Sequence, residues 1–188
     1  MSCFLTKNIK HTREYNPGGI NAIFLLDIRD FVSYTFNDDK LYNECLVENI
    51  KAVAGYIEIS TVNESNFTET QDSDIYKQEL STYVRSLDAE KLSNLLIAKT
   101  NRYLVAFTTL QGKAFVFGSD GGASLTFTQQ TGQTGENTGY AIKLTKNSIY
   151  PLFEVKVDEI NKSIQWILDS GKWDEKGIWT RKDIWKTV

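Results

Sequence analysis

Runs of bulky apolar and β-branched residues alternate with short polar stretches along most of the chain, a pattern typical of β-strands. Residues 20–28 (INAIFLLDI) form the first long run and predict a buried strand, and residues 31–36 (FVSYTF) continue the strand character. Residues 103–109 (YLVAFTT) and 113–118 (KAFVFG) flank a short connection that contains Gly112. Because glycine tolerates the left-handed conformation that a tight connection requires, this pair predicts a β-hairpin.

Three more strands are expected after the hairpin, at residues 123–128 (ASLTFT), 140–145 (YAIKLT) and 149–155 (IYPLFEV). A polar stretch at residues 129–139 separates the first two. Pro151 has no backbone N–H to donate to a ladder, which predicts that the last strand lies at an edge of its sheet. Residues 3–6 are a further candidate edge strand, and NPGG at residues 16–19 predicts a turn.

Three segments fit more than one structure. Residues 46–60 are ambiguous between helix and strand, although residues 56–60 (YIEIS) alternate as a strand does. Residues 63–74 are rich in Thr, Ser, Asn, Asp and Glu, which predicts either a loop or a solvated strand at a sheet edge. Residues 75–84 (IYKQELSTYV) favour a strand, with a helix as the competing interpretation.

Two segments have helical spacing. Residues 88–100 place leucines on one stripe, and Asp88 fits the N-cap position. Residues 157–170 also show the spacing and end at Gly171, as a C-terminal glycine cap predicts. The patterns together predict a mainly β (α+β) fold: a β-sandwich or half-barrel with one flanking amphipathic helix, followed by a helical extension.

The last part of the chain differs in composition from the rest. All four tryptophans lie within the final 23 residues, as Trp166, Trp173, Trp179 and Trp185. We therefore expect two parts, a β domain at residues 1–155 and a C-terminal helical, Trp-rich arm at residues 156–188. Aromatic side chains are enriched at interfaces. The four tryptophans are candidate assembly contacts, and the alternative is that their rings fold back over the chain's own sheets.

The bulk composition limits the class of protein. The 188 residues are 41% apolar and 24% charged, values typical of a soluble globular domain. The sequence has no run of about 18 apolar residues and no apolar stretch of a secretory signal at its start, so we expect synthesis in a cytoplasm and no membrane association. A formal charge of −3 argues against a basic surface that binds nucleic acid tightly. It is compatible with a channel through which DNA slides, because a mildly acidic channel wall does not hold the phosphates.

Residue types needed for catalysis or metal binding are scarce. Cys3 and Cys45 lie far apart in the sequence, and His11 is the only histidine. A zinc site has too few ligands among them, and a nucleophile–histidine triad would depend on His11, which stands in a polar basic segment. Acidic pairs at residues 38–39 and 72–74 stand in turn-like polar runs and are interpreted as solvated. We expect no catalytic, metal-binding or cofactor-binding residue.

Six of the twelve glycines fall within residues 117–144. A phosphate-binding loop would need a lysine and Ser or Thr at the start of a helix after its glycines. Here Gly118, Gly121 and Gly122 are followed by strand-like residues without a lysine, so we expect a tight turn between strands.

The second group of glycines lies in residues 131–138 (TGQTGENT), which carry no apolar anchor. This composition predicts a projecting loop that a neighbouring molecule orders, although a plain surface loop is the alternative. The candidate assembly-loop residues are Gln133, Thr134, Gly135, Glu136 and Asn137.

The order of short patterns along the chain resembles a family of structural proteins of tailed bacteriophages that infect Bacteroidota. The shared landmarks are CFLTK at residues 3–7, Gly18-Gly19-Ile20, the Leu-Asp-Ala at residues 87–89, Gly112, Phe117-Gly118, residues 121–125, Thr131-Gly132 and GYAIKL at residues 139–144. The chain departs from this family at residues 11–15, where a second cysteine is often found, and in the tryptophan-rich segment after Val155.

Proteins of this kind are similar to tail tube proteins, whose β-sandwich or half-barrel subunits join their sheets into a ring around an axis. In crAss-like phages, related subunits are thought to form stacked rings between the portal and the tail nozzle. The resemblance implies a non-enzymatic virion protein in a homo-oligomeric ring, six- or twelve-fold, in contact with other portal or tail ring proteins. DNA would pass through its channel without specific binding.

The tryptophan-rich arm bears on which ring is implied. A repeating tube subunit stacks only on itself, whereas a ring made once must recognise a different protein, and a dedicated arm suits that task. We therefore expect a collar or connector ring, with a repeating major tail tube subunit as one alternative. An alternative of a different class is a carbohydrate-binding β-sandwich whose tryptophans stack on sugars. The acids around Glu69, Asp72 and Asp74 are candidates for the channel or for a subunit contact.

Overall fold

The computed structural model describes residues 18–36, 45–59, 65–131 and 137–160, together with the strand residues 172–173 and 179–180. Its elements in chain order are β1 (Ile20–Asp27), β2 (Phe31–Phe36), β3 (Leu46–Ala52), β4 (Ile57–Ile59), β5 (Asn66–Asp72), β6 (Ile75–Arg85), α1 (Ala89–Thr100), β7 (Arg102–Thr109), β8 (Ala114–Phe117), β9 (Ala123–Gln130), β10 (Gly139–Ser148), β11 (Phe153–Val155), β12 (Lys172–Trp173) and β13 (Trp179–Thr180).

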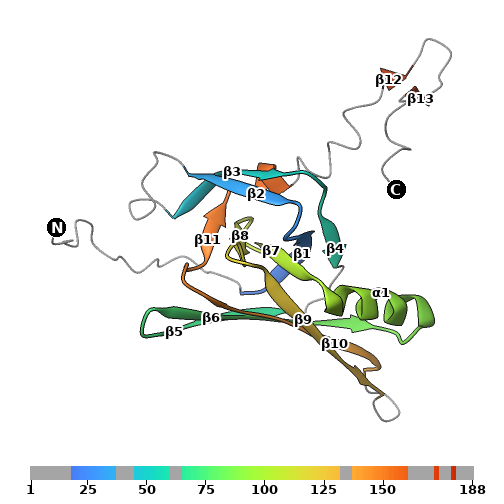
Figure 1. The fold of residues 1–188 in the computed structure, drawn as a ribbon. Coiled ribbons are helices and arrows are strands. Elements are labelled where there is room, and N and C mark those ends of the chain that lie inside the picture. The colour runs from blue at the N-terminus through green and yellow to red at the C-terminus, as the bar shows by residue number, and fades with distance from the viewer. Residues whose placement is uncertain are drawn as a thin grey trace.

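The strands β1 to β11 form one mixed sheet, shown in Figure 1. The strand order is β2-β3-β11-β8-β7-β9-β10-β6-β5, and β1 pairs with both β7 and β4. The pair β11 and β3 is parallel, whereas the other pairs of this sheet are antiparallel. The prediction of a mainly β fold is therefore confirmed.

The sheet folds back on both sides of its central strands. In Figure 1, β2 and β3 lie above β1, β7 and β8, while the hairpins β5–β6 and β9–β10 lie below them. Alternate residues of β7 consequently enter two different cores. Val105 and Phe107 pack below β7, in what we call the lower core, and Leu104 and Ala106 pack above it, in the upper core.

The lower core lies between the central strands and the two hairpins. Its fully buried aliphatic side chains include Ile23, Leu80, Leu125, Ile142 and Leu144. Burial of each such side chain contributes roughly 1.5–3 kcal/mol. The helix α1 packs against this core through the partly buried Leu92, Leu95 and Ala98. The Asp88 side chain accepts a hydrogen bond from the Lys91 backbone N–H at 2.8 Å, so the predicted helix and its N-cap are confirmed.

The structure resolves the three ambiguous segments as strands. Residues 46–60 contain β3 and β4, with a break between them at residues 53–56. The polar residues 63–74 contain β5, which pairs with β6 alone at the end of the sheet, so the edge-strand alternative is correct. β6 is a strand of 11 residues that pairs with β5 on one side and β10 on the other.

The prediction that the last strand lies at an edge is wrong. β11 pairs with β8 on one side and β3 on the other, for example through Phe153 opposite Val116 and Glu154 opposite Leu46. Pro151 lies in the connection before β11, at a position that belongs to no ladder. Its missing N–H therefore costs the sheet nothing, which is why proline gave a misleading signal here.

Several predicted features lie outside the described residues: the candidate strand at 3–6, His11, the first half of the turn at 16–19, the acids at 38–39, and the helix at 157–170 beyond residue 160. Residues 157–160 are helical. Within the described ranges, no helix is long and apolar enough to cross a membrane. The same ranges contain no cluster of three or more His, Cys, Asp or Glu side chains arranged to hold a metal ion.

Candidate functional site

The connection between β8 and β9 is a tight glycine turn. Gly118, Gly121 and Gly122 have φ angles of +89°, +100° and +78°, and the Gly122 N–H donates to the Gly118 carbonyl at 2.9 Å. A Cβ on Gly122 would lie 2.6 Å from the Cβ of Arg102 and 2.9 Å from the Tyr103 nitrogen. The predicted turn is therefore confirmed, and Gly122 is required both by its φ angle and by the closeness of β7.

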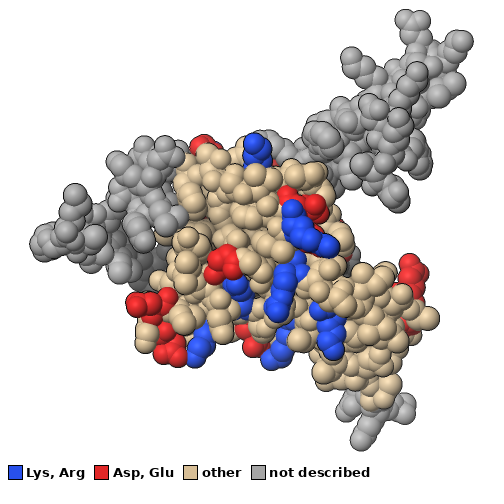
Figure 2. Space-filling model, in the orientation of Figure 1, with Lys and Arg blue, Asp and Glu red and all other residues tan. Residues whose placement is uncertain are grey.

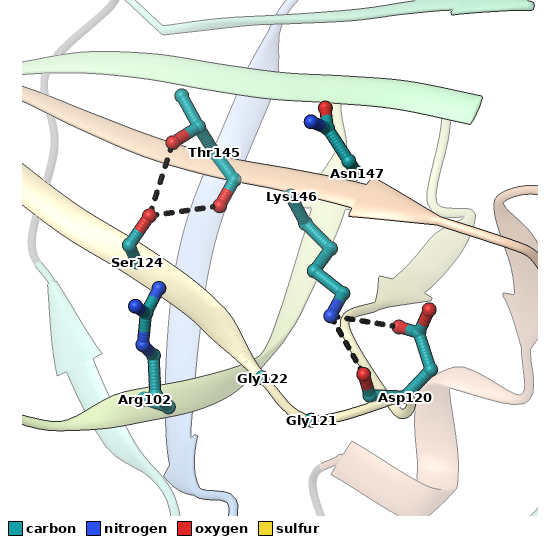
Figure 3. Close-up of a pocket in the computed structure, with 8 residues that line it drawn as sticks. All are labelled: Arg102, Asp120, Gly121, Gly122, Ser124, Thr145, Lys146 and Asn147. Atoms are coloured by element: carbon teal, nitrogen blue, oxygen red, sulfur yellow. Dashed lines mark hydrogen bonds and ion pairs between the residues drawn. The ribbon is translucent and has the colours of Figure 1, made fainter. Parts of the chain in front are cut away.

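This turn forms one wall of a pocket of about 480 Å³, which we call the polar pocket (Figure 3). It is lined by Arg102, Asp120, Gly121, Gly122, Ser124, Thr145, Lys146 and Asn147. Ser124 and Thr145 face one another from β9 and β10, with their hydroxyl oxygens 3.2 Å apart. The pocket is thus built from three elements, the start of β7, the turn, and the hairpin β9–β10.

Lys146 fixes the turn. Its ammonium donates to the Asp120 carbonyl at 2.6 Å and lies 3.4 Å from Asp120 Oδ1, and both side chains are only 16% exposed. Asp120 Oδ2 accepts the Ile149 N–H at 3.2 Å. The lysine that a phosphate loop would need therefore reaches the glycines from β10, but Asp120 already neutralises its charge. Lys146 and Asp120 thus hold the turn in place.

A second pocket of about 250 Å³ lies on the other side of the turn, and we call it the aromatic pocket. It is lined by Phe31, Ser33, Tyr34, Phe36, Ser119, Tyr150 and Phe153. Its rings pack mainly edge to face: the ring centroids of Tyr34 and Phe153 are 6.2 Å apart, and those of Phe36 and Phe153 are 5.2 Å apart. Local sequence gives no signal for this pocket, since its walls come from β2, the glycine turn, the segment leading into β11 and β11 itself.

Two tyrosines in and beside the upper core have strongly perturbed acidity. Burial is the main cause that raises the pKa of Tyr34 well above its ordinary value, and the neighbouring Tyr56 acts in the same direction, whereas Ser119 acts in the opposite one. Burial likewise raises the pKa of Tyr56. Both hydroxyls stay neutral at physiological pH. Each hydroxyl oxygen is buried without a well-formed hydrogen bond in the described part of the chain.

The outward side of the sheet β9-β10-β6-β5 carries a continuous polar surface. Phe67, Leu80, Leu144 and Leu125 are opposite one another in register and face the lower core. Alternation therefore turns the next row, Thr68, Glu79, Thr145 and Ser124, outward. We call this surface the polar face, and its polar residues are Thr68, Thr70, Lys77, Glu79, Ser81, Ser124, Thr126, Thr128, Lys143, Thr145 and Asn147. Ile75, Tyr83 and Ala141 lie on the same side of their strands.

The charges of the polar face are paired. Lys143 Nζ lies 2.8 Å from Glu79 Oε1, and Lys77 Nζ lies 2.6 Å from Asp72 Oδ2. The hydrogen bond from Lys143 is the main cause that lowers the pKa of Glu79. On the side of the molecule seen in Figure 2, acidic and basic side chains are interspersed, without a large field of one sign. The polar face is therefore hydrophilic, but its described lysines are paired and form no array of free cations that would hold phosphates.

The acids expected at a channel or subunit contact have different surroundings. Glu69 points inward, because its Oε2 accepts the Gln78 side-chain amide and the Leu152 N–H, both at 2.8 Å. Asp72 pairs with Lys77 at the end of the hairpin β5–β6, and Asp74 is exposed in the turn. Glu69 thus has a structural role, tying the connection before β11 to the edge strand.

The predicted assembly residues are described only in part. Of the loop, Gln133, Thr134, Gly135 and Glu136 lie outside the described residues, whereas Asn137 is exposed beside the last ladder pair, Gly139 opposite Gln130. Of the arm, Trp166 and Trp185 lie outside the described residues. Trp173 and Trp179 are backbone neighbours in the short pair β12–β13, which is separate from the large sheet.

No protein-family model, curated protein or solved structure matches this chain.

Proposed function

We propose that this chain is a non-enzymatic virion protein that forms a homo-oligomeric ring around the DNA channel in the portal–tail (collar or connector) region of a tailed phage. The proposal starts from the ordered sequence landmarks shared with phage structural proteins. The structural observation that supports it further is the polar face, in which Lys77 and Lys143 are each paired with an acid, as a wall past which DNA slides requires.

The polar face suits passing DNA for an electrostatic reason. Each unpaired Lys or Arg on a channel wall would release counterions by binding a phosphate, and several such contacts would hold the duplex in place. Lys77 and Lys143 are instead paired with Asp72 and Glu79, and most of the other side chains of the face are hydroxyls or amides. DNA would slide past this surface without specific binding.

The ends of the sheet provide a reason for a ring. β5 pairs only with β6, so one row of its backbone N–H and C=O groups has no partner strand in the described part of the chain. Exposed edges of this kind favour pairing with another chain. A head-to-tail contact between different surfaces of identical subunits closes into a ring when the rotation between them fits. Ring closure would cover the β5 edge and place equivalent polar faces around one axis.

The ring interpretation includes six- or twelve-fold symmetry and contacts with other portal or tail ring proteins through the arm and the loop at residues 131–138. A repeating tube subunit is the nearest alternative. The carbohydrate-binding alternative gains one observation, the aromatic pocket, but its rings meet edge to face and leave no flat platform for a sugar.

The test is native mass spectrometry on the purified full chain at micromolar concentration, with and without a panel of glycans. We expect a single closed species of six or twelve copies and no mass shift with any glycan. A chain that remains a monomer at every concentration would overturn the ring, and a glycan adduct on that monomer would favour the binding module instead.

A further inference from the structure

The aromatic pocket is built like a receptor for one large side chain. Phe31, Tyr34 and Phe36 come from β2, which among the described strands pairs only with β3 at the end of the sheet, and Phe153 comes from β11. Its volume of about 250 Å³ lies below the roughly 300–1,000 Å³ of pockets for drug-sized ligands. An aromatic ring that enters it would meet ring faces and edges on several sides, the arrangement of an interface hot spot.

The polar groups of the pocket select for an amphipathic ring. The buried Tyr34 hydroxyl has no well-formed hydrogen bond in the described part of the chain, and the hydroxyls of Ser33 and Ser119 also line the pocket. The Ser119 side chain acts on this hydroxyl, whose oxygen can still accept a hydrogen bond, so an occupant that donates one is favoured over a purely aliphatic side chain. A tryptophan fits both requirements, since its ring is apolar and its indole N–H needs an acceptor.

The chain itself carries such occupants. Its four tryptophans all lie in residues 161–188, and this segment follows directly on Ile160, which is fully buried in the same upper core as Phe153. Residues 161–188 contain six Lys or Arg and four Asp or Glu, a net charge of +2. Since the whole chain has −3, residues 1–160 have −5, and the segment and the body attract one another.

We propose that the aromatic pocket binds a tryptophan side chain from the C-terminal segment, residues 161–188, of a neighbouring copy of this chain. The inference rests on the proposed ring, which brings identical copies side by side. Because β2 is an end strand of the sheet, the pocket lies at a boundary where a neighbouring copy can reach it. One indole fills one pocket, so the other three tryptophans of each copy remain for a contact with a different ring protein.

Two full-length variants test this exchange by complementation. Ser33 is an exposed residue of β2 that lines the pocket. In Ser33→Arg, the long arginine side chain blocks the pocket, while all four tryptophans remain. In the tryptophan-free variant, Trp166, Trp173, Trp179 and Trp185 are all changed to alanine while the pocket remains open. Thr35→Arg is the matched control, because Thr35 is exposed on the same strand but does not line the pocket.

The readouts are tryptophan emission, iodide quenching and sedimentation of the same samples. We expect Thr35→Arg to match the wild type, and Ser33→Arg alone to show red-shifted, more strongly quenched emission. Mixing Ser33→Arg with the tryptophan-free variant should restore the blue shift, and the shift should saturate near an equimolar ratio. In this mixture all tryptophan emission comes from Ser33→Arg, whose own pocket is blocked. Its indoles can therefore enter only the open pocket of the tryptophan-free variant.

Two outcomes would overturn the inference: emission of Ser33→Arg alone that is as blue-shifted as that of the wild type, or no recovery in the mixture. The last result would mean that the segment fills its own subunit's pocket. Sedimentation separates this failure from that of the ring. If the mixture sediments as closed oligomers but its emission is not blue-shifted, the exchange is wrong and the ring is not contradicted. If the blue shift recovers in open or dimeric species, the exchange is supported and the ring is contradicted.

Discussion

At the scale of single residues, the glycine turn shows what local sequence reveals and what it hides. The turn itself follows from Gly118, Gly121 and Gly122, because positive φ angles are a property of the residues in the turn. The partner of the turn is hidden, since Lys146 comes from β10, 26 residues after Asp120. A search for a lysine next to the glycines could not find it. The aromatic pocket was missed for the same reason.

Gly122→Ala should destabilise the fold by roughly 3 kcal/mol, the sum of a strained φ angle and a clash with β7. The matched control is Gly112→Ala, at nearly the same φ (+75° against +78°) but with nothing within 4 Å of the added Cβ. It should lose only about 1 kcal/mol. The measurement is urea unfolding of both variants, and equal losses would show that the closeness of β7 does not matter.

Lys146→Met should lower the free energy of unfolding by about 2 kcal/mol at neutral pH, since it leaves the mostly buried Asp120 carboxylate without its cation. Lys77→Met removes an ion pair whose side chains are more than half exposed and should cost less than about 1 kcal/mol. Thermal unfolding of the two variants measures both losses of stability. A larger loss for Lys77→Met would contradict the role assigned to the turn.

At the scale of elements, local pattern predicted most strands and the helix, and it failed where pairing decides the outcome. The hairpin β7–β8 and α1 carry their own signals, in Gly112 and in Asp88. β11 is different, because its three residues are held by distant β3 and β8 and not by any propensity of their own. The proline before it therefore predicted an edge that the sheet does not have.

The cap of α1 gives a prediction about pH. Hydrogen bonds from Lys91 lower the pKa of Asp88 below its ordinary value of 3.8. A carboxyl group with a lowered folded pKa contributes stability that is present above pH 3.8 and is lost as the pH falls through the folded pKa. Asp88→Asn keeps a capping side chain but cannot titrate.

The thermal stability of the wild type should thus exceed that of Asp88→Asn at neutral pH, and the difference should shrink as the pH falls below 3.8. Melting curves between neutral pH and pH 3 measure this difference. A gap that stays constant over that range would mean that the charge of Asp88 does not stabilise the helix.

At the scale of the whole molecule, the sheet places different surfaces on different sides. The hairpins below the central strands present the polar face, and β2 above them presents the aromatic pocket. The sequence predicted a solvated strand at the sheet edge as one alternative for residues 63–74, and no solvated face for the neighbouring strands. The polar residues of these four strands form one face because of the register between the strands, and a single sequence does not reveal that register.

Thr128→Lys should make the assembled protein retain duplex DNA in gel-shift experiments at low salt, because it adds one cation per subunit to the polar face, opposite the uncharged Ala141 in register. The wild type should retain none. Asn49→Lys is the control, since Asn49 is exposed on β3, on the opposite side of the central strands. Equal retention by both variants would show that the polar face is not the surface that meets DNA.

Electron microscopy of the purified full chain shows whether it forms a closed ring whose wall is the polar face. We expect ring-shaped averages with six or twelve subunits and an open centre, with the hairpins β5–β6 and β9–β10 of every subunit directed toward that centre. Particles that remain single subunits, or rings in which these hairpins face outward, would contradict it.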